Sequence, residues 1–226
     1  MRRASNSIAM LALAVLAGAV SLNACAQSKP DSLLEKWTPG IHYKQLEQSQ
    51  ATKVEKGKIE VAEFFWYGCG HCYSLDPALE VWKTSKAPYV QFVRVPVIWG
   101  PQHRQHAKLY YTTQELKKPE LHSQIFDAIQ KQGKALAAAT DDEARAQHLA
   151  FCKDHGVTEA DFNKAYDSTI VAENVAHADV LAQRYGVSSV PLIFVNGKYE
   201  TGVGAAGSPE KLLALINDLA ASEKGR

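Results

Sequence analysis

The sequence has few cysteines and almost no net charge. Its 226 residues include four cysteines, and 25 basic side chains are offset by 24 acidic ones, which leaves a formal net charge of +1. Without an excess of positive charge, nothing in the composition predicts a polyanionic partner such as a nucleic acid. A chain of this length buries a core without covalent staples. The cysteines are therefore not expected to form a structural disulfide scaffold.

The N-terminus carries an apolar run at 8–22 that is too short for a confident membrane-spanning helix. Two arginines precede this run and the sequence ACA follows it at 24–26, a pattern typical of a secretory signal peptide. We expect residues 1–26 to be this signal. An alternative is a bacterial lipobox that ends at Cys25, which would make Cys25 the lipidated first residue of a lipoprotein. In both cases the mature protein lies outside the cytoplasm, where disulfides persist.

The first half of the chain predicts a strand–helix–strand unit. β-branched and aromatic residues at 59–65 and 89–97 indicate two strands, and the segment from Cys69 to about Ser85 indicates a helix between them. Such a unit implies parallel strands joined by a right-handed crossover. A short edge strand is expected before it, at 40–46.

From about 102 to 185 the sequence predicts helices almost throughout. Thr140 with Glu143 forms a capping box, and Thr158 with Asp161 marks another helix start. Glycines 133, 156 and 186 follow predicted helix ends, where glycine is common.

Strands return near the C-terminus. Leu192–Val195 and 198–201 flank Asn196-Gly197, a pair typical of a type I′ hairpin turn, and a last helix is expected after Ser208. The glycines of 202–207 match a dinucleotide-binding pattern, but no strand with an acidic residue follows them. We interpret that segment as a flexible turn.

This order of elements predicts an α/β protein with a thioredoxin-like fold into which an all-helical domain is inserted. We expect the thioredoxin-like domain to be discontinuous, with residues 37–101 and 176–222, and the helical domain to occupy 102–175.

The motif Cys69-Gly70-His71-Cys72 is compatible with a metal site, a structural disulfide or a redox pair. A disulfide that closes so short a loop removes little entropy from the unfolded chain. A zinc site needs further ligands, but Cys152 stands alone, and His148 and His155 have no partner thiol at metal-ligand spacing. His103 and His106, three residues apart on a predicted helix, could approach a metal but more often lie on a solvated face. Cys152 is expected to be a small buried hydrophobe beside Phe151.

The redox interpretation follows from where the motif lies. Cys69 is at a helix N-terminus, where unpaired N–H groups and the helix dipole stabilise a thiolate. His71 can donate a hydrogen bond or carry positive charge, with the same effect. Cys72 lies one turn further into the helix and should be more buried and stay protonated. This asymmetry suits thiol–disulfide exchange, in which Cys69 forms a mixed disulfide with the substrate and the second thiol resolves it. The sequence SSVP at 188–191, at a strand start, is compatible with a cis-proline.

The runs EFFWYGCGHC at 63–72 and GVSSVPLIFVNGKY at 186–199, separated by a helical block and preceded by an export signal, resemble the DsbA family of periplasmic disulfide oxidases. The resemblance covers about 37–221. It implies that Cys69 is the exposed nucleophile, that Cys72 is the buried resolving cysteine and that His71 stabilises the thiolate. It further implies that Val190-Pro191 forms a cis-proline loop that faces the disulfide and binds an extended substrate segment.

Two further residues are interpreted through this resemblance. Glu63 matches a buried acidic residue that can act in proton transfer and should have a raised pKa. Its alternative interpretation is a polar residue at a strand end. Gly70 stands where the best-known members of the family have proline. The resemblance therefore does not fix the redox potential of the pair.

The resemblance implies a periplasmic enzyme that introduces disulfides into exported proteins with free cysteines. It implies no cofactor beyond the Cys69–Cys72 disulfide, reoxidation by a quinone-linked membrane partner of the DsbB type, and a monomer. The alternatives are a disulfide isomerase or reductase, a metal-binding module that uses the two cysteines, and a non-catalytic chaperone with an apolar groove beside them.

Overall fold

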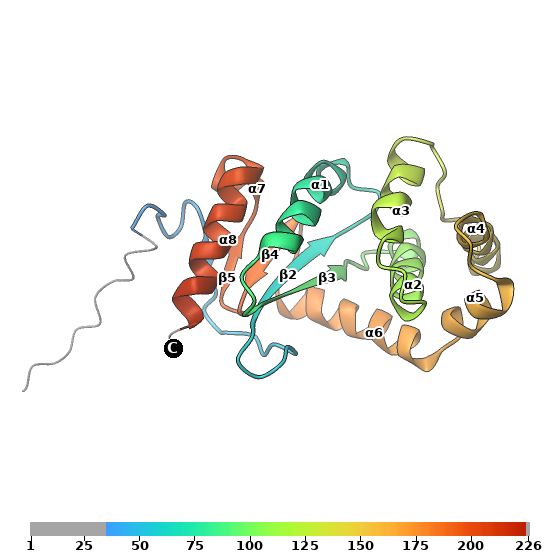
Figure 1. Cartoon of the computed structure of the whole chain (residues 1–226), viewed down its shortest axis with the longest axis horizontal. Coiled ribbons are helices and arrows are strands. Elements are labelled where there is room, and N and C mark those ends of the chain that lie inside the picture. Colours follow the sequence, from blue (N-terminus) through green and yellow to red (C-terminus); the bar gives the residue numbers. More distant parts are fainter. Residues whose placement is uncertain (1–34, 225–226) are drawn as a thin grey trace, which may run out of the picture.

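The computed structural model describes residues 35–224. Its sheet has the strand order β1-β5-β4-β2-β3, with β2 and β3 parallel and the other pairs antiparallel. Figure 1 shows the helices arranged around this sheet and beyond one edge of it. The strands are β1 (Lys44–Gln45), β2 (Ile59–Phe65), β3 (Val90–Pro96), β4 (Leu192–Val195) and β5 (Tyr199–Thr201).

The central strand, β2, is buried along its whole length. Helix α1 (Gly70–Ser85) follows it directly and joins it to the parallel strand β3, as the sequence predicts. One face of the sheet packs against α1 and α8 (Pro209–Lys224) through Leu79, Trp82, Leu212 and Leu215. The end of β2 and the start of α1 are therefore held by a packed core, which fixes the position of the motif between them.

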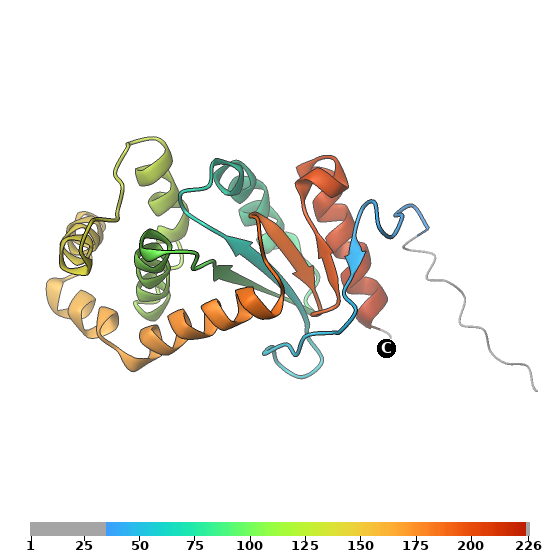
Figure 2. The same ribbon diagram turned by 180° about the vertical axis from the view of Figure 1, so that it is seen from behind.

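The other face of the sheet packs against α6 (Thr169–Arg184), which runs along it in Figure 2. Ala178 and Ala182 of α6 join Phe64 of β2 and Phe194 of β4 in one buried cluster. Small side chains on α6 let the helix approach the aromatic residues of the strands closely.

The four helices between β3 and α6 form a block beside the β3 side of the sheet (Figure 1). Thr140 and Glu143 form the predicted capping box, and Thr158 accepts a hydrogen bond from the backbone N–H of Asp161. The core of this block is continuous with Phe65 and Cys72, so it reaches the motif. Its helices are α2 (Pro101–Glu115), α3 (Leu121–Gln130), α4 (Asp141–Asp154) and α5 (Glu159–Tyr166), followed by α6.

The thioredoxin-like arrangement expected from the sequence is confirmed by this sheet and its helices. The interpretation of 202–207 as a flexible turn was wrong, because Val203–Ala206 form a short helix, α7, that Gly207 ends with φ +92°. Two alanines between the glycines favour helix there. The predicted signal peptide and Cys25 lie outside the described residues. The division into 37–101 with 176–222 and 102–175 stays a prediction, and α6 runs through residue 175 without interruption.

Within residues 35–224, no helix has the length and apolar character needed to cross a membrane.

The capping box at the start of α4 gives a test of the helical block. We expect Thr140→Ala to lower the free energy of unfolding by about 1 kcal/mol, because the backbone N–H of Glu143 then loses its partner. Urea unfolding measures this. Thr84→Ala, at an exposed position in the last turn of α1, is the control and should change stability by less than about 0.5 kcal/mol. Equal values for the two variants would contradict a stabilising cap.

Candidate active site

Cys69 lies at the N-cap of α1 and is partly exposed. Its backbone N–H donates to the carbonyl of Trp66, which closes the turn between β2 and the helix. Its thiol donates to the carbonyl of Val190 at 3.5 Å, across a sequence separation of 121 residues. The fold therefore brings together the two sequence motifs that are far apart in the chain.

Cys72, in the first turn of α1, has no exposed surface. Burial raises the pKa of its thiol well above the ordinary value, and the nearby Glu63 acts in the same direction. The expected asymmetry is confirmed: one thiol at the surface at a helix start, the other buried and protonated. Both cysteines are free thiols in this structure.

The peptide bond between Val190 and Pro191 is cis, as the sequence allowed. This loop leads directly into β4, which pairs with the central strand β2 through Leu192 and Phe64. Both sides of the cysteine–carbonyl contact therefore rest on neighbouring strands of one sheet, and their relative position does not depend on a long loop.

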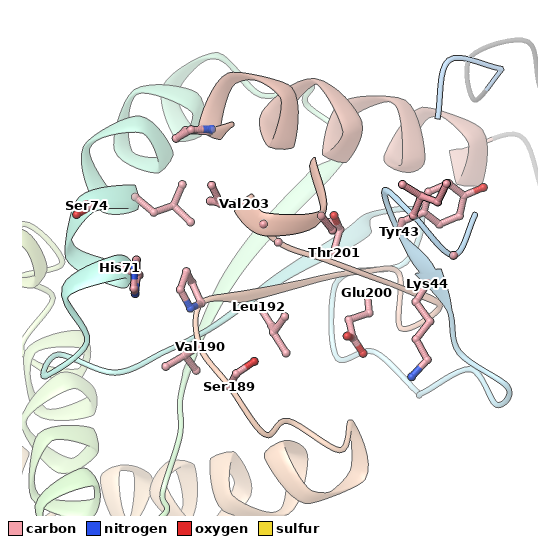
Figure 3. Close-up of a pocket in the computed structure, with 18 residues that line it drawn as sticks. Tyr43, Lys44, His71, Ser74, Ser189, Val190, Leu192, Glu200, Thr201 and Val203 are labelled. Carbon is pink, nitrogen blue, oxygen red and sulfur yellow. The ribbon is translucent and has the colours of Figure 1, made fainter. Parts of the chain in front are cut away.

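A groove with a volume of about 630 Å³ opens beside the motif. Figure 3 shows His71 of α1 facing the loop of Val190, while Lys44 and Glu200 lie at the opposite end of the groove. The wall between these ends is mainly apolar, with Ile41, Leu75, Pro191, Leu192 and Val203 among its residues. A groove of this kind suits an extended segment of another chain rather than a small polar molecule.

His71 and Gly70 lie in the first turn of α1, and both are exposed. His71 lines the groove, and its predicted effect on the Cys69 thiolate stays a prediction. A Cβ atom added at Gly70 would have only the side-chain oxygen of Gln130 within 4 Å, at 3.9 Å. Steric exclusion by the surroundings therefore does not account for glycine at this position.

Glu63 is almost completely buried and accepts a 2.8 Å hydrogen bond from Nε of Arg94, its neighbour across β2 and β3. Arg94 also donates to Asp76 at 2.9 Å and to Glu80 at 2.7 Å, both on α1. Burial raises the pKa of Glu63 despite the charge of Arg94. The raised pKa expected for this residue is confirmed. Its direct partner, an arginine, was not foreseen.

Cys152 and the two candidate histidines, His103 and His106, lie in different environments. Cys152 is buried in the helical block, and burial raises its pKa to about 12, as expected for a small buried hydrophobe. The expectation that His103 and His106 lie on a solvated face was wrong for His106, which is 1% exposed and accepts from the indole N–H of Trp66 at 3.1 Å. His103 is partly buried and stacks on the same indole, with ring centroids 4.3 Å apart.

Among residues 35–224, no three His, Cys, Asp or Glu side chains are arranged to hold a metal ion.

Sequence reasoning missed a buried polar group beneath the motif. It consists of Tyr67, Asp76, Arg94 and His122, with Glu63 as the one member that was foreseen. A lone arginine in the apolar run QFVRVPV and an aspartate one helical turn after Cys72 are signals that could have pointed to it.

Comparison with known proteins agrees with this geometry. Residues 90–217 match the family model of the DSBA-like thioredoxin domain. The thiol:disulfide interchange protein DsbA of Azotobacter vinelandii is 40% identical over 172 residues, which cover 76% of this chain and 78% of the relative. The DsbA of Pseudomonas aeruginosa PAO1 is 35% identical over 191 residues, or 84% and 87% of the two chains.

Solved structures give the same result. The crystal structure of Pseudomonas aeruginosa DsbA superposes with a TM-score of 0.77 at 33% identity and covers 84% of this chain and 96% of that chain. The oxidoreductase DsbA of Xylella fastidiosa superposes with a TM-score of 0.73 at 25% identity, with coverage of 82% and 96%. With its fold and these relatives, the chain belongs to the DsbA family of thiol:disulfide interchange proteins and is a disulfide oxidoreductase.

Proposed function

We propose that Cys69 and Cys72 form the redox pair and that the protein uses it to introduce disulfides into exported proteins. The observation that carries this proposal is the contact of the Cys69 thiol with the Val190 carbonyl, at the mouth of an apolar groove, while Cys72 is buried. An incoming sulfur can reach one sulfur of the pair from the surface but not the other. The exchange is therefore directed to Cys69.

The proposed reaction begins with the Cys69–Cys72 disulfide. A substrate thiolate attacks Sγ of Cys69, a substrate–Cys69 bond forms, and the bond between Cys69 and Cys72 breaks with its electron pair on Cys72. A second substrate thiolate then attacks the substrate sulfur of the mixed disulfide. The product disulfide leaves, and Cys69 departs as a thiolate at the N-terminus of α1, where the helix dipole favours negative charge. Two electrons pass from the substrate to the pair.

The leaving sulfur of Cys72 needs a proton, because burial strongly disfavours its thiolate. Glu63 is the proposed source, since its carboxyl group is buried, has a raised pKa and interacts electrostatically with Cys72. His71 is proposed to stabilise the Cys69 thiolate from the exposed side, and Gly70 to set the flexibility of the helix start.

The groove and the Val190-Pro191 loop are proposed to bind an extended segment of the substrate beside its cysteine. The apolar wall fits side chains that unfolded or partly folded proteins expose and folded ones bury. We propose that such substrates are exported chains with free cysteines and that the protein acts on them in the periplasm, with a lipid anchor at Cys25 as the alternative to signal removal.

Regeneration of the disulfide needs an oxidant that accepts two electrons. We propose a membrane quinone reductase of the DsbB type, by analogy with the family, and no cofactor other than the disulfide itself. The protein is proposed to act as a monomer of two domains, 37–101 with 176–222 and 102–175.

Cysteine variants test the assigned roles. We expect Cys69→Ser to abolish oxidation of a reduced protein substrate, because the accessible sulfur is gone. Cys72→Ser should accumulate a mixed disulfide at Cys69 when it meets a preformed substrate disulfide, since no second thiol resolves it. Mass spectrometry after acid trapping detects both outcomes. Cys152→Ser is the matched control and should oxidise substrate at the wild-type rate, and loss of activity in this variant alone would overturn the assignment.

The redox potential separates an oxidase from a reductase. In glutathione buffers we expect a value near the strongly oxidising end, about −120 mV, as is typical of DsbA, rather than about −270 mV, as in thioredoxin. Thiol trapping at equilibrium measures it. A value near that of thioredoxin would make the protein a reductant and remove the oxidase assignment.

The groove is tested at Ile41, which lines it and is 65% exposed. We expect Ile41→Asp to lower kcat/KM for an unfolded protein substrate by about tenfold, because roughly 1.4 kcal/mol of apolar contact is lost. The equilibrium with glutathione, which is too small to fill the groove, should stay unchanged. Val81→Asp, at an equally exposed position (70%) that does not line the groove, is the control. Similar losses in both variants would contradict a binding role for the groove.

A further inference from the structure

His122 connects two parts of the active-site region. It lies on α3 with 2% of its surface exposed. Its Nδ1 is 2.9 Å from the hydroxyl of Tyr67, in the turn that leads to Cys69. Its Nε2 is 3.2 Å from Oδ1 of Asp76 on α1, a close polar contact whose geometry falls short of a hydrogen bond. The same oxygen accepts from Arg94 at 2.9 Å.

The neighbours of His122 determine its tautomer. Asp76 accepts from Arg94 and, through Oδ2, from Ser123 at 2.7 Å, so its carboxylate is ionised and acts as an acceptor only. The imidazole must then carry its proton on Nε2. Burial lowers the pKa of His122 to about 4, which keeps the ring neutral near pH 7 and leaves Nδ1 as an acceptor. The hydroxyl of Tyr67 must therefore be the donor to Nδ1.

We propose that His122 is a positioning residue for disulfide exchange. Its ring links the Tyr67 hydroxyl to the Asp76 carboxylate and thereby sets the pH at which the buried carboxyl groups behind Cys72 take up a proton. This inference rests on the proposed roles of Cys72 and Glu63. His122 touches neither cysteine in the contacts described above, and it acts through Asp76 and Arg94.

The coupling passes through the guanidinium of Arg94, which Asp76, Glu63 and Glu80 share. Burial raises the pKa of Asp76, but its polar contacts with His122 and Ser123 and the positive charge of Arg94 outweigh burial and leave it lowered. If the Nε2–H group is removed, Asp76 depends more on Arg94, and less of that positive charge remains to stabilise ionised Glu63. The carboxyl groups then keep a proton to higher pH.

The other groups around His122 do not replace this function. Tyr110 of α2 approaches it with ring centroids 5.8 Å apart, and Phe65 of β2 and Phe126 of α3 pack on its ring at 5.0 and 5.1 Å. Burial raises the pKa of Tyr110 and of Tyr67 above their ordinary values, so both phenols stay protonated at neutral pH. Between about pH 5 and 8 the His122 ring and both phenols keep their protonation states, so within this buried group only the carboxyl groups gain or lose a proton.

The experiment measures the rate at which dithiothreitol reduces the oxidised protein between about pH 4 and 8, divided by the concentration of reductant thiolate. This normalised rate should rise as the pH falls, because a protonated carboxyl group can supply the proton that the departing Cys72 sulfur needs. In His122→Phe the rise should begin about one pH unit higher, because the buried carboxylate loses its polar contact with Nε2. His122→Gln, whose amide can place an N–H near the position of Nε2, should restore most of the wild-type profile.

His148→Phe is the matched control. His148 is also buried, with its pKa lowered to about 4 by burial, but its Nε2 contacts the carbonyl of Leu136 in the helical block. We expect this variant to lose stability without a change in the pH profile. An equal shift in His148→Phe, or the wild-type profile in His122→Phe, would overturn the proposal.

Two further outcomes keep the test decisive. If His122→Phe does not fold, Tyr67→Phe removes the other end of the link while it keeps the aromatic ring, and it should shift the profile in the same direction by a smaller amount. An unchanged profile in Tyr67→Phe would then overturn the inference. If the wild-type protein is not reduced at Cys69–Cys72 at all, the proposed function fails. Exchange in the wild type with no effect of these variants refutes the role of His122 alone.

Discussion

The guanidinium of Arg94 is the interaction on which the active-site region depends. It is 8% exposed and compensates three carboxylates, one on β2 and two on α1. A buried ion pair of this kind often contributes little net stability, because desolvation offsets the Coulomb attraction, but removal of one partner is costly. In this protein the ion pairs of Arg94 matter because they hold β3, β2 and α1 in a fixed arrangement. Strand β3 fixes the angle between β2 and α1, and the motif lies where those two elements join.

That junction also explains how two identical side chains acquire different chemistry. Cys69 is at the N-cap of α1 and partly exposed, whereas Cys72 lies in the first turn and is surrounded by aromatic residues of the helical block. Burial raises the pKa of the second sulfur, and the first escapes this effect because it is partly exposed. The asymmetry is a product of position along α1, which is why it could be predicted from the spacing of the motif after an apolar strand.

Local signals in the sequence predicted local structure well. The bounds of β2 and β4, the capping box at Thr140 and the parallel β2–β3 pair all follow from periodicity, caps and connection rules, and the structure confirms them. The contacts of Arg94 and His122 could not be predicted in the same way, because their partners lie on other elements and periodicity does not specify which helix covers which residue. His106 shows the same limit. Its spacing from His103 marks one helix face, but only the fold shows that Trp66 covers it.

The helical block holds the turn that carries the proposed reactive cysteine. The turn that leads to Cys69 is held by this block at two successive residues. Trp66 stacks on His103 and donates to His106 of α2, and the carbonyl of Tyr67 accepts from the side chain of Gln130 on α3 at 2.7 Å. On its other side, Cys69 contacts the Val190 loop, which leads into strand β4 of the sheet. A change in the orientation of the block relative to the sheet would move the turn against that loop, so the relative position of the two parts determines the environment of the reactive sulfur.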